Sequence, residues 1–221
     1  MVVVERNSFE KFLQAIAKTG VETNIEIEKN CIKSTTVDAG HIFMVMAKMP
    51  CVGSKDEKVT ITISPEKTLK MLKLIKDDRL NLKINSKLWL NENIGIGLVD
   101  TVDTPKEPKL DFDISAKFVD LKRLREIVKT GMEISDNCKF IAKEKLFIEI
   151  EGDVDVIKFD VLEKVEGEGE AMFSIDLLYE LLKGHLYMGN LMFGTNKPLR
   201  LEVMEDDVQI VYLLAPRIES D

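Results

Sequence analysis

Two short segments of this chain are closely similar: Ala17-Lys18-Thr19-Gly20-Val21-Glu22 and Val128-Lys129-Thr130-Gly131-Met132-Glu133. Each follows apolar residues spaced three and four apart, the pattern of an amphipathic helix, and each glycine is placed to end that helix. Ser64 and Ser174, both good helix N-caps, stand at nearly the same distance further along and predict a second helix in each half. The chain is therefore predicted to be a duplication of a unit half its length.

Runs of alternating apolar residues between turn signals predict β-strands around these helices. In the first half the runs are 24–28, 31–35, 41–49, 58–63, 80–84, 88–90 and 94–99. In the second half they are 140–142, 146–150, 154–162, 171–173, 191–193, 199–203 and 208–214.

The two halves are joined by Pro105-Lys106-Glu107-Pro108-Lys109, which predicts an extended linker because two prolines disfavour helix and central strand alike. The fold class predicted is α+β, with two duplicated domains that each pack two helices on antiparallel sheets. The expected boundaries are 1–100 for the first domain, 101–110 for the connecting loop and 111–221 for the second domain.

The composition is that of an ordinary globular protein, with 45% hydrophobic and 32% charged residues among 221. No run approaches the roughly 20 apolar residues of a membrane helix, and the start Met1-Val2-Val3-Val4 lacks the features of a signal peptide. Three cysteines, Cys31, Cys51 and Cys138, have no metal-binding spacing and favour a reducing compartment.

The sequence contains no catalytic constellation. The only histidines, His41 and His185, lie in no metal-binding motif. The segment 94–97 (Ile-Gly-Ile-Gly) lacks the third glycine of a phosphate-binding loop, and the acidic pairs 77–78 and 206–207 are typical of turns. We therefore expect no enzymatic activity, no cofactor and no metal.

Basic residues gather on the polar faces of three of the four predicted helices. The net charge of −8 argues against nucleic acid, but this segregation would let one surface attract phosphates while the remainder stays anionic. The fourth helix is the exception, because Asp176 and Glu180 accompany only Lys183. The basic residues of these three helices, the candidates to contact nucleic-acid phosphates, are Lys11, Lys18, Lys67, Lys70, Lys73, Lys76, Lys122, Arg123, Arg125 and Lys129.

The last predicted strand runs directly into Ala215-Pro216 and stops there, because proline cannot donate to a sheet ladder. One apolar residue, Ile218, remains among charges in the tail. Strand and tail together, Tyr212-Leu213-Leu214-Ala215-Pro216-Arg217-Ile218-Glu219, resemble the C-terminus of the proliferating cell nuclear antigen (PCNA) family, the DNA sliding clamps of archaea and eukaryotes. The segments 37–45 (Val-Asp-Ala-Gly-His-Ile-Phe-Met-Val), 107–112 (Glu-Pro-Lys-Leu-Asp-Phe) and 134–136 (Ile-Ser-Asp) resemble the family in the same order.

This resemblance, which spans nearly the full chain, implies a ring of three subunits with helices lining a central hole and sheets forming the outer wall. It implies a non-enzymatic processivity factor that encircles duplex DNA without sequence specificity. DNA polymerase, clamp loader, flap nuclease and ligase would bind through short peptide motifs, with no cofactor and no membrane. The ring could be a homotrimer or a heterotrimer. The Lys/Glu/Ile-rich composition resembles archaeal members, which implies a cytoplasmic, nucleoid-associated protein; a eukaryotic member would be nuclear.

The resemblance also assigns residues. The partner-peptide pocket would use His41, Ile42, Met44, Val102, Pro105, Leu213, Ala215, Pro216 and Ile218. Subunits would join edge to edge between strands 94–99 and 154–162, through Ile94, Ile96, Leu98, Val156, Ile157, Phe159 and Val161.

Two alternatives stay open. One is a clamp paralogue that regulates or sequesters partners, or serves as one subunit of a heterotrimer. The weakly basic fourth helix and the shortened loop at 51–54 favour it. The other is a two-repeat saddle protein like the TATA-binding protein, which would bend DNA with basic residues on a strand face. Here the basic residues lie on predicted helices instead.

Overall fold

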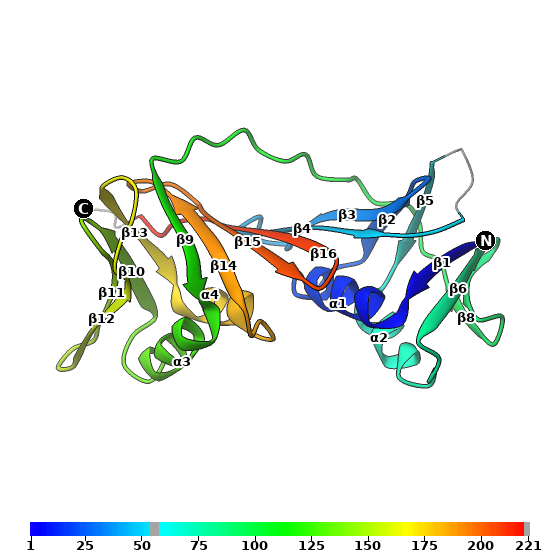
Figure 1. The fold of residues 1–221 in the computed structure, drawn as a ribbon, viewed down its shortest axis with the longest axis horizontal. Coiled ribbons are helices and arrows are strands. Elements are labelled where there is room, and N and C mark those ends of the chain that lie inside the picture. The colour runs from blue at the N-terminus through cyan, green and yellow to red at the C-terminus, as the bar shows by residue number, and fades with distance from the viewer. Residues whose placement is uncertain (54–57, 219–221) are drawn as a thin grey trace. The chain divides into compact units, whose positions relative to one another are not determined.

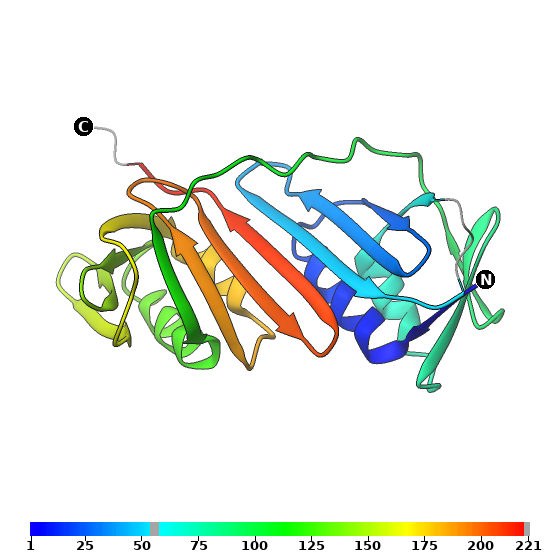
Figure 2. The same ribbon diagram turned by 45° about the horizontal axis from the view of Figure 1, so that its top comes forward.

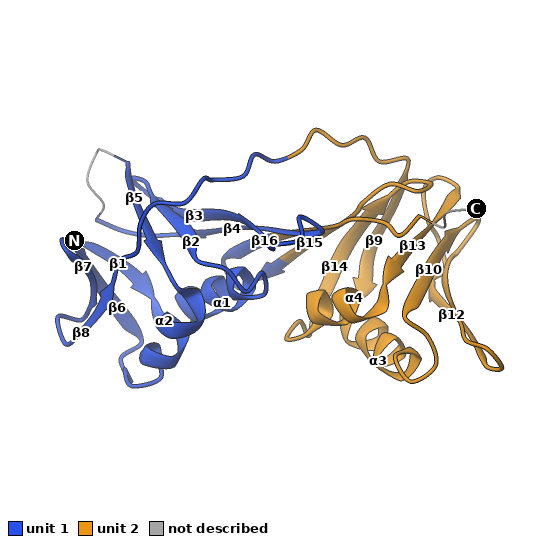
Figure 3. Ribbon diagram, turned by 180° about the vertical axis from the view of Figure 1, so that it is seen from behind, with its two compact units in different colours: residues 1–107, 204–210 blue, residues 108–203, 211–221 orange. Residues whose placement is uncertain are grey.

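The computed structural model describes residues 1–53 and 58–218 (Figure 1). Ser54, Glu219 and Ser220, which belong to segments singled out in the sequence, lie outside this range. By internal contacts the chain divides into two units (Figure 3), Met1–Glu107 with Met204–Ile210 and Pro108–Val203 with Val211–Asp221. None of the helices in the described ranges has the length and apolar composition needed to cross a membrane.

The two halves of the chain share one order of elements: strand, helix, four strands, helix, three strands. The first half contains β1 (Val2–Glu5), α1 (Arg6–Ala17), β2 (Thr23–Ile27), β3 (Cys31–Val37), β4 (Phe43–Pro50), β5 (Val59–Ile63), α2 (Pro65–Leu72), β6 (Arg79–Ile84), β7 (Lys87–Leu90) and β8 (Ile94–Gly97). The second contains β9 (Ile114–Asp120), α3 (Leu121–Gly131), β10 (Asn137–Ala142), β11 (Leu146–Glu151), β12 (Val156–Leu162), β13 (Gly169–Ser174), α4 (Ile175–Leu182), β14 (Met188–Phe193), β15 (Leu199–Glu205) and β16 (Val208–Leu214).

Each half builds antiparallel sheets around a pair of helices, which lie side by side against them (Figure 2). In the first half one sheet has the order β1-β6-β7-β8, and β5-β2-β3-β4 are neighbours in a second. In the second half one sheet has the order β12-β11-β10-β13, and β16, β15, β14 and β9 are hydrogen-bonded neighbours in that order. The α+β fold class predicted from the sequence is confirmed.

The helices bury the apolar faces that their spacing predicted. Phe9, Phe12, Leu13 and Ile16 of α1 are all buried, as are Leu121, Leu124 and Val128 of α3. Helix α2 begins as expected, since the Ser64 side chain accepts the Lys67 N–H at 3.4 Å and Pro65 is the first helical residue. Ser174 occupies the N-cap position of α4 but makes no side-chain cap hydrogen bond.

The two repeated glycines both stand where a helix ends, as predicted, but in different conformations and surroundings. Gly20 follows α1 with a φ of +69°, the left-handed conformation of a helix stop. Gly131 is the buried last residue of α3, where a Cβ would overlap the Cδ1 of Ile150 and approach Ile175 Cδ1 at 2.9 Å. Its smallness lets the helix approach the sheet closely.

Other boundaries also differ from the prediction. Strands β1 and β9 were not predicted. Helix α2 ends at Leu72, so Lys73 is its C-cap and Lys76 lies in the following turn, although both were predicted on the helix. Residues 98–113 contain no regular secondary structure, which agrees with the extended linker predicted around the two prolines.

Candidate functional site

One of the two histidines, His185, and the buried thiol of Cys138 pack within the protein interior. His185 is buried, with a ring nitrogen 2.8 Å from the Tyr212 hydroxyl, and burial raises the pKa of Cys138 to about 12, which keeps that thiol neutral. In the described ranges, no three His, Cys, Asp or Glu side chains gather as a metal site requires. The exposed surfaces are therefore the candidates for function.

Most of the cations predicted to face DNA are exposed. In the described chain none of the following six forms an ion pair, so their ammonium groups remain available to phosphates: Lys67, Lys70, Lys73, Lys76, Lys122 and Lys129.

The two predicted cations of α1 have a different environment. Lys11 Nζ lies 2.6 Å from an Asp206 carboxylate oxygen and 3.6 Å from one of Glu205. Burial raises the pKa of Glu205, while the neighbouring Lys11 charge opposes that shift. Lys18 is half-buried at the C-cap of the helix. Lys11 is thus largely neutralised by its own unit.

Arg123 also differs from its neighbours on α3. Its guanidinium carbon lies 5.1 Å from the centre of the Phe159 ring on β12, a cation–π contact, and Arg125 is half-buried. On α4, the single cation Lys183 pairs with Glu180 at 3.0 Å, and Asp176 is exposed. Of the two helices described in the second unit, α3 is therefore the one that carries exposed cations without an ion pair, Lys122 and Lys129.

Two strand edges remain uncovered in the described chain, and both belong to strands predicted to join subunits. The outer edge of β1 is capped by a two-way backbone bridge between Val3 and Val52, and that of β13 by a bridge between Met172 and Arg217. At the opposite ends of the same sheets, β8 and β12 have no further strand beside them. Such edges present unpaired backbone groups that another chain can extend.

The strand β12 combines its free edge with exposed apolar side chains. Val156 and Phe159 are exposed, and Ile157 and Val161 are half-buried. Between β12 and α3 lies a groove of about 470 Å³, lined by Arg123, Glu126, Ile127, Thr130, Ile157 and Phe159. Its mostly apolar wall suits burial against a partner.

Strand β8 presents mainly backbone groups, and few side chains, to a partner at its free edge. Ile96 is fully buried, so its side chain belongs to the core of its own unit. Ile94 is half-buried, and Leu98, also half-buried, lies past the end of the strand.

The residues of the first unit that were predicted to bind peptides lie in the turn before β4, on β4 and in the connecting segment. His41 and Ile42 are exposed in a turn where the Asp38 carboxylate accepts the N–H groups of Ile42 and Phe43 at 2.8 and 2.7 Å. Met44 follows half-buried on β4.

Val102 is exposed and Pro105 half-buried in the connecting segment, which buried Asn24 anchors. The Asn24 amide donates to the Val102 carbonyl at 2.5 Å and to Thr104 Oγ1 at 2.8 Å, and its oxygen accepts from Thr62. The sequence analysis missed this anchor; an amide among the apolar residues of strand 24–28 was the available signal.

In the second unit, the tail after β16 is fastened by a residue that the sequence analysis did not assign. The Arg217 N–H donates to the Met172 carbonyl at 2.7 Å, and its guanidinium donates to Asn137 Oδ1 at 2.7 Å. Leu213 is buried and Ala215 and Pro216 are half-buried, whereas Ile218 is 72% exposed. Arg217 thus fixes the tail to the second unit and leaves the Ile218 side chain exposed to solvent.

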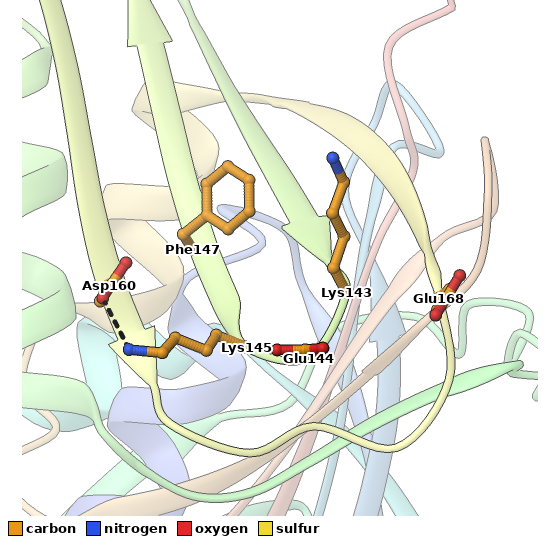
Figure 4. Close-up of a pocket in the computed structure, with 6 residues that line it drawn as sticks. All are labelled: Lys143, Glu144, Lys145, Phe147, Asp160 and Glu168. Carbon is orange, nitrogen blue, oxygen red and sulfur yellow. Dashed lines mark hydrogen bonds and ion pairs between the residues drawn. The ribbon is translucent and has the colours of Figure 1, made fainter.

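An open cavity of about 560 Å³ lies on the second unit, beside the β10–β11 hairpin (Figure 4). Its lining mixes charges, and Lys145 pairs with Asp160 at 3.4 Å. The hydrogen bond that Lys145 donates to the Glu163 carboxylate raises the pKa of Lys145. The lining side chains are Lys143, Glu144, Lys145, Phe147, Asp160 and Glu168.

Comparison with known proteins finds relatives that share one description, DNA polymerase sliding clamp. The chain is 30% identical to the DNA polymerase sliding clamp of Archaeoglobus fulgidus, over 94% of both chains. It is 24% identical to the DNA polymerase sliding clamp of Methanothrix thermoacetophila, over 99% of this chain and 98% of that protein. No family model matches the chain.

Among solved structures, the fold matches A. fulgidus PCNA bound to the C-terminal region of FEN-1, with a TM-score of 0.89 and 26% identity. The match covers 100% of this chain and 99% of that one.

Proposed function

The chain belongs to the DNA polymerase sliding clamp family, and we propose that copies of it close into a ring around duplex DNA and hold replication and repair enzymes there. The observation that carries this proposal is the pair of uncovered edges, β8 and β12, on one chain. Two different edges on each subunit favour a head-to-tail contact, which closes into a ring when the rotation between subunits allows it. A trimer of identical subunits is the arrangement proposed.

The exposed lysines of α2 and the cations of α3 are proposed to attract the phosphates of the encircled DNA. Contacts to phosphate carry no sequence information, so a ring held by them can slide. Retention is topological, because a closed ring leaves only by opening. The function needs no catalysis and no cofactor of its own.

Partner enzymes are proposed to bind through short peptides. Ile42, Met44, Val102 and Pro105 in the first unit, and Ile218 in the tail, supply apolar contacts, and His41 supplies a polar one. The FEN-1 complex of the A. fulgidus protein supports this proposal and names a flap nuclease as one partner. Polymerase, clamp loader and ligase are proposed by the same reasoning. Since the relatives reported above are archaeal, we propose a cytoplasmic, nucleoid-associated location.

A topological experiment tests the proposal. The protein is loaded by a clamp loader and ATP onto a nicked circular plasmid, and bound protein is measured by gel filtration in high salt before and after the plasmid is cut once. Retention on the circle and release from the linear product are expected. Equal retention on both forms would contradict encirclement.

The paralogue alternative has one observation in its favour, the acidic residues on α4. It predicts that partner peptides bind while the protein alone is not retained on circular DNA, and that retention returns when a second clamp chain is added.

A further inference from the structure

Four large apolar side chains are exposed together at one place in the second unit. Phe118 is 73% exposed, and Leu186, Tyr187 and Met188 are 59%, 56% and 53% exposed. We call these four residues the junction patch, because they lie where β9 meets α3 and where β14 begins (Figure 1). None of them belongs to the edges, the cations or the peptide-binding residues described above.

Backbone contacts bring the four residues together. Met188 pairs with Asp120 across the β9–β14 ladder, and the Leu121 N–H donates to the Tyr187 carbonyl at 3.3 Å. The Phe118 N–H donates to Asn190 Oδ1 at 3.2 Å. These hydrogen bonds connect the segment around Phe118 to the segment around Tyr187. The fold of the unit therefore fixes the position of the patch.

Phe118 is held in an unfavourable conformation. Its φ is +59°, a left-handed value that bulky residues rarely adopt and that Asn or Gly would adopt more easily. The β9–β14 register shifts at this point, between Gly189 and Leu191, as in a β-bulge. An aromatic residue kept in a strained position and turned to solvent points to a role outside the fold.

The first unit provides an internal comparison. There the Arg6 N–H donates to the Asp78 carbonyl at 2.7 Å, and Glu5 pairs with Arg79 across β1 and β6. The residues equivalent to 186–188 are thus Asp77, Asp78 and Arg79, which are all exposed, and Arg79 forms an ion pair with Glu5 at 2.9 Å. The same turn folds with charged residues in one unit and is apolar in the other, so the turn itself does not require apolar side chains.

We propose that the junction patch is a second docking surface, which binds a partner protein through an amphipathic helix with an apolar face and acidic flanks. Aromatic residues and methionine are enriched in protein interfaces, and contiguous exposed apolar groups mark such sites. Acidic flanks are favoured because exposed Lys117 directly precedes Phe118 on β9 and exposed Lys122 lies in the first turn of α3 that follows. Lys117 is 3.9 Å from Glu166 in an exposed and therefore weak pair.

Two other occupants fit less well. The Asp120 carboxylate caps α3 by accepting the Arg123 N–H at 3.0 Å, so the partial positive charge of the helix N-terminus offsets its charge in part. A single strand of nucleic acid would also be attracted by cations, but it stacks on aromatic rings, and Leu186 and Met188 offer none. A second copy of the chain is the remaining occupant, and solution mass distinguishes it.

The experiment uses the full chain and two variants. The first carries Leu186→Asp, Tyr187→Asp and Met188→Arg, which copies the turn of the first unit. The second carries Phe118→Asn, which removes the ring and suits the left-handed backbone. The probe is a fluorescein-labelled helical peptide of Leu and Glu, about 18 residues long so that it is helical when bound. Peptides with Lys in place of Glu, and with scrambled Leu positions, are the comparisons.

Fluorescence anisotropy is expected to show binding of the Leu/Glu peptide to the wild type and at least about tenfold weaker binding to both variants, with the Lys and scrambled peptides weak throughout. Phe118→Asn should keep or raise the melting temperature, which separates docking from folding. Leu74→Asp, at another exposed apolar position (74%), is the matched control and should bind like the wild type.

Equal binding by wild type and both variants would overturn the proposal. A fall in solution mass in either variant would also overturn it, because the patch would then be a contact between copies. So would a loss of binding to a labelled thymidine oligonucleotide alone, because the patch would then be a nucleic-acid surface. Retention of the variants on circular DNA, measured as above, keeps this result separate from the proposed clamp function.

Discussion

The guanidinium of Arg123 lies over the ring of Phe159, with 5.1 Å between the guanidinium carbon and the ring centre. This contact joins the polar face of α3 to the free-edge strand β12. Arg123 was predicted from the sequence as a DNA-facing cation, and its position beside the groove gives it a second candidate role in the contact between subunits.

Arg123→Ala and Phe159→Ala should therefore weaken assembly. Each removes one side of the same contact, so the dissociation constant should rise about tenfold for either change and little further for both together. Light scattering over a dilution series measures this. Arg125→Ala, on the same helix, is the control and should leave the mass unchanged. If Arg123→Ala lost DNA retention at unchanged mass, Arg123 would be a DNA contact and not a subunit contact.

Charge reversal of the exposed lysines should weaken DNA binding equally on every sequence. We expect Lys70→Glu, Lys73→Glu and Lys129→Glu each to lower the slope of log affinity against log salt, by about 0.9 for each phosphate that the protein no longer neutralises. Lys143→Glu carries the same charge change on the β10–β11 hairpin and should have little effect. A variant that failed to bind one DNA sequence alone would argue for sequence recognition instead.

Ile218→Arg should abolish binding of the FEN-1 C-terminal peptide in calorimetry, because the exposed apolar side chain of the tail is replaced by a charge. Solution mass should not change, since β8 and β12 are untouched. Ile218→Val keeps most of the apolar surface and should bind with only a few-fold loss. Unchanged affinity in Ile218→Arg would remove the tail from the peptide-binding residues.

The two repeated glycines should respond differently to alanine. Gly131→Ala should cost about 1–3 kcal/mol of unfolding free energy, because its Cβ meets Ile150 Cδ1 in the core. Adding Ile150→Val, which lacks that methyl group, should recover part of the loss. Gly20→Ala has open space around the new Cβ and should cost about 1 kcal/mol from its left-handed φ alone. Urea unfolding compares them; recovery of Gly20→Ala by the Ile150 change would refute the distinction.

Asn24→Ala should loosen the connecting segment and cost about 1–3 kcal/mol, since the Thr62 hydroxyl loses its acceptor in a buried site. Hydrogen exchange at residues 102–104 should quicken with it. Thr62→Val in the same chain removes that orphaned hydroxyl and should restore some stability without slowing exchange in the segment. If exchange at 102–104 is unchanged in Asn24→Ala, the amide does not hold the loop.

Periodic features were predictable from the sequence, and features that depend on distant neighbours were not. The buried faces of α1 and α3 follow from the spacing of Phe9, Phe12 and Ile16, and of Leu121 and Leu124. Strand β9 was missed because its alternation breaks where Lys117 and Phe118, both exposed, separate buried Ala116 from Val119. The bulge that causes this break depends on β14, which lies far along the chain.

The candidate surfaces, too, have features that the sequence predicts and features that it does not. Which lysines are exposed could be predicted from helix geometry. That Lys11 is neutralised by Asp206, that Ile96 is buried and that Arg217 holds the tail depend on contacts across long stretches of chain. Composition and spacing within one segment do not encode those contacts.

The free edges of β8 and β12 have a consequence for how the protein behaves at low concentration. Dilution ordinarily protects against aggregation, but in the proposed ring it would separate subunits and expose the two strands that the proposed assembly covers. The form most prone to aggregation is then the newly made or dissociated chain. A cell would keep this protein soluble by keeping it abundant, and a purified sample should be stored concentrated.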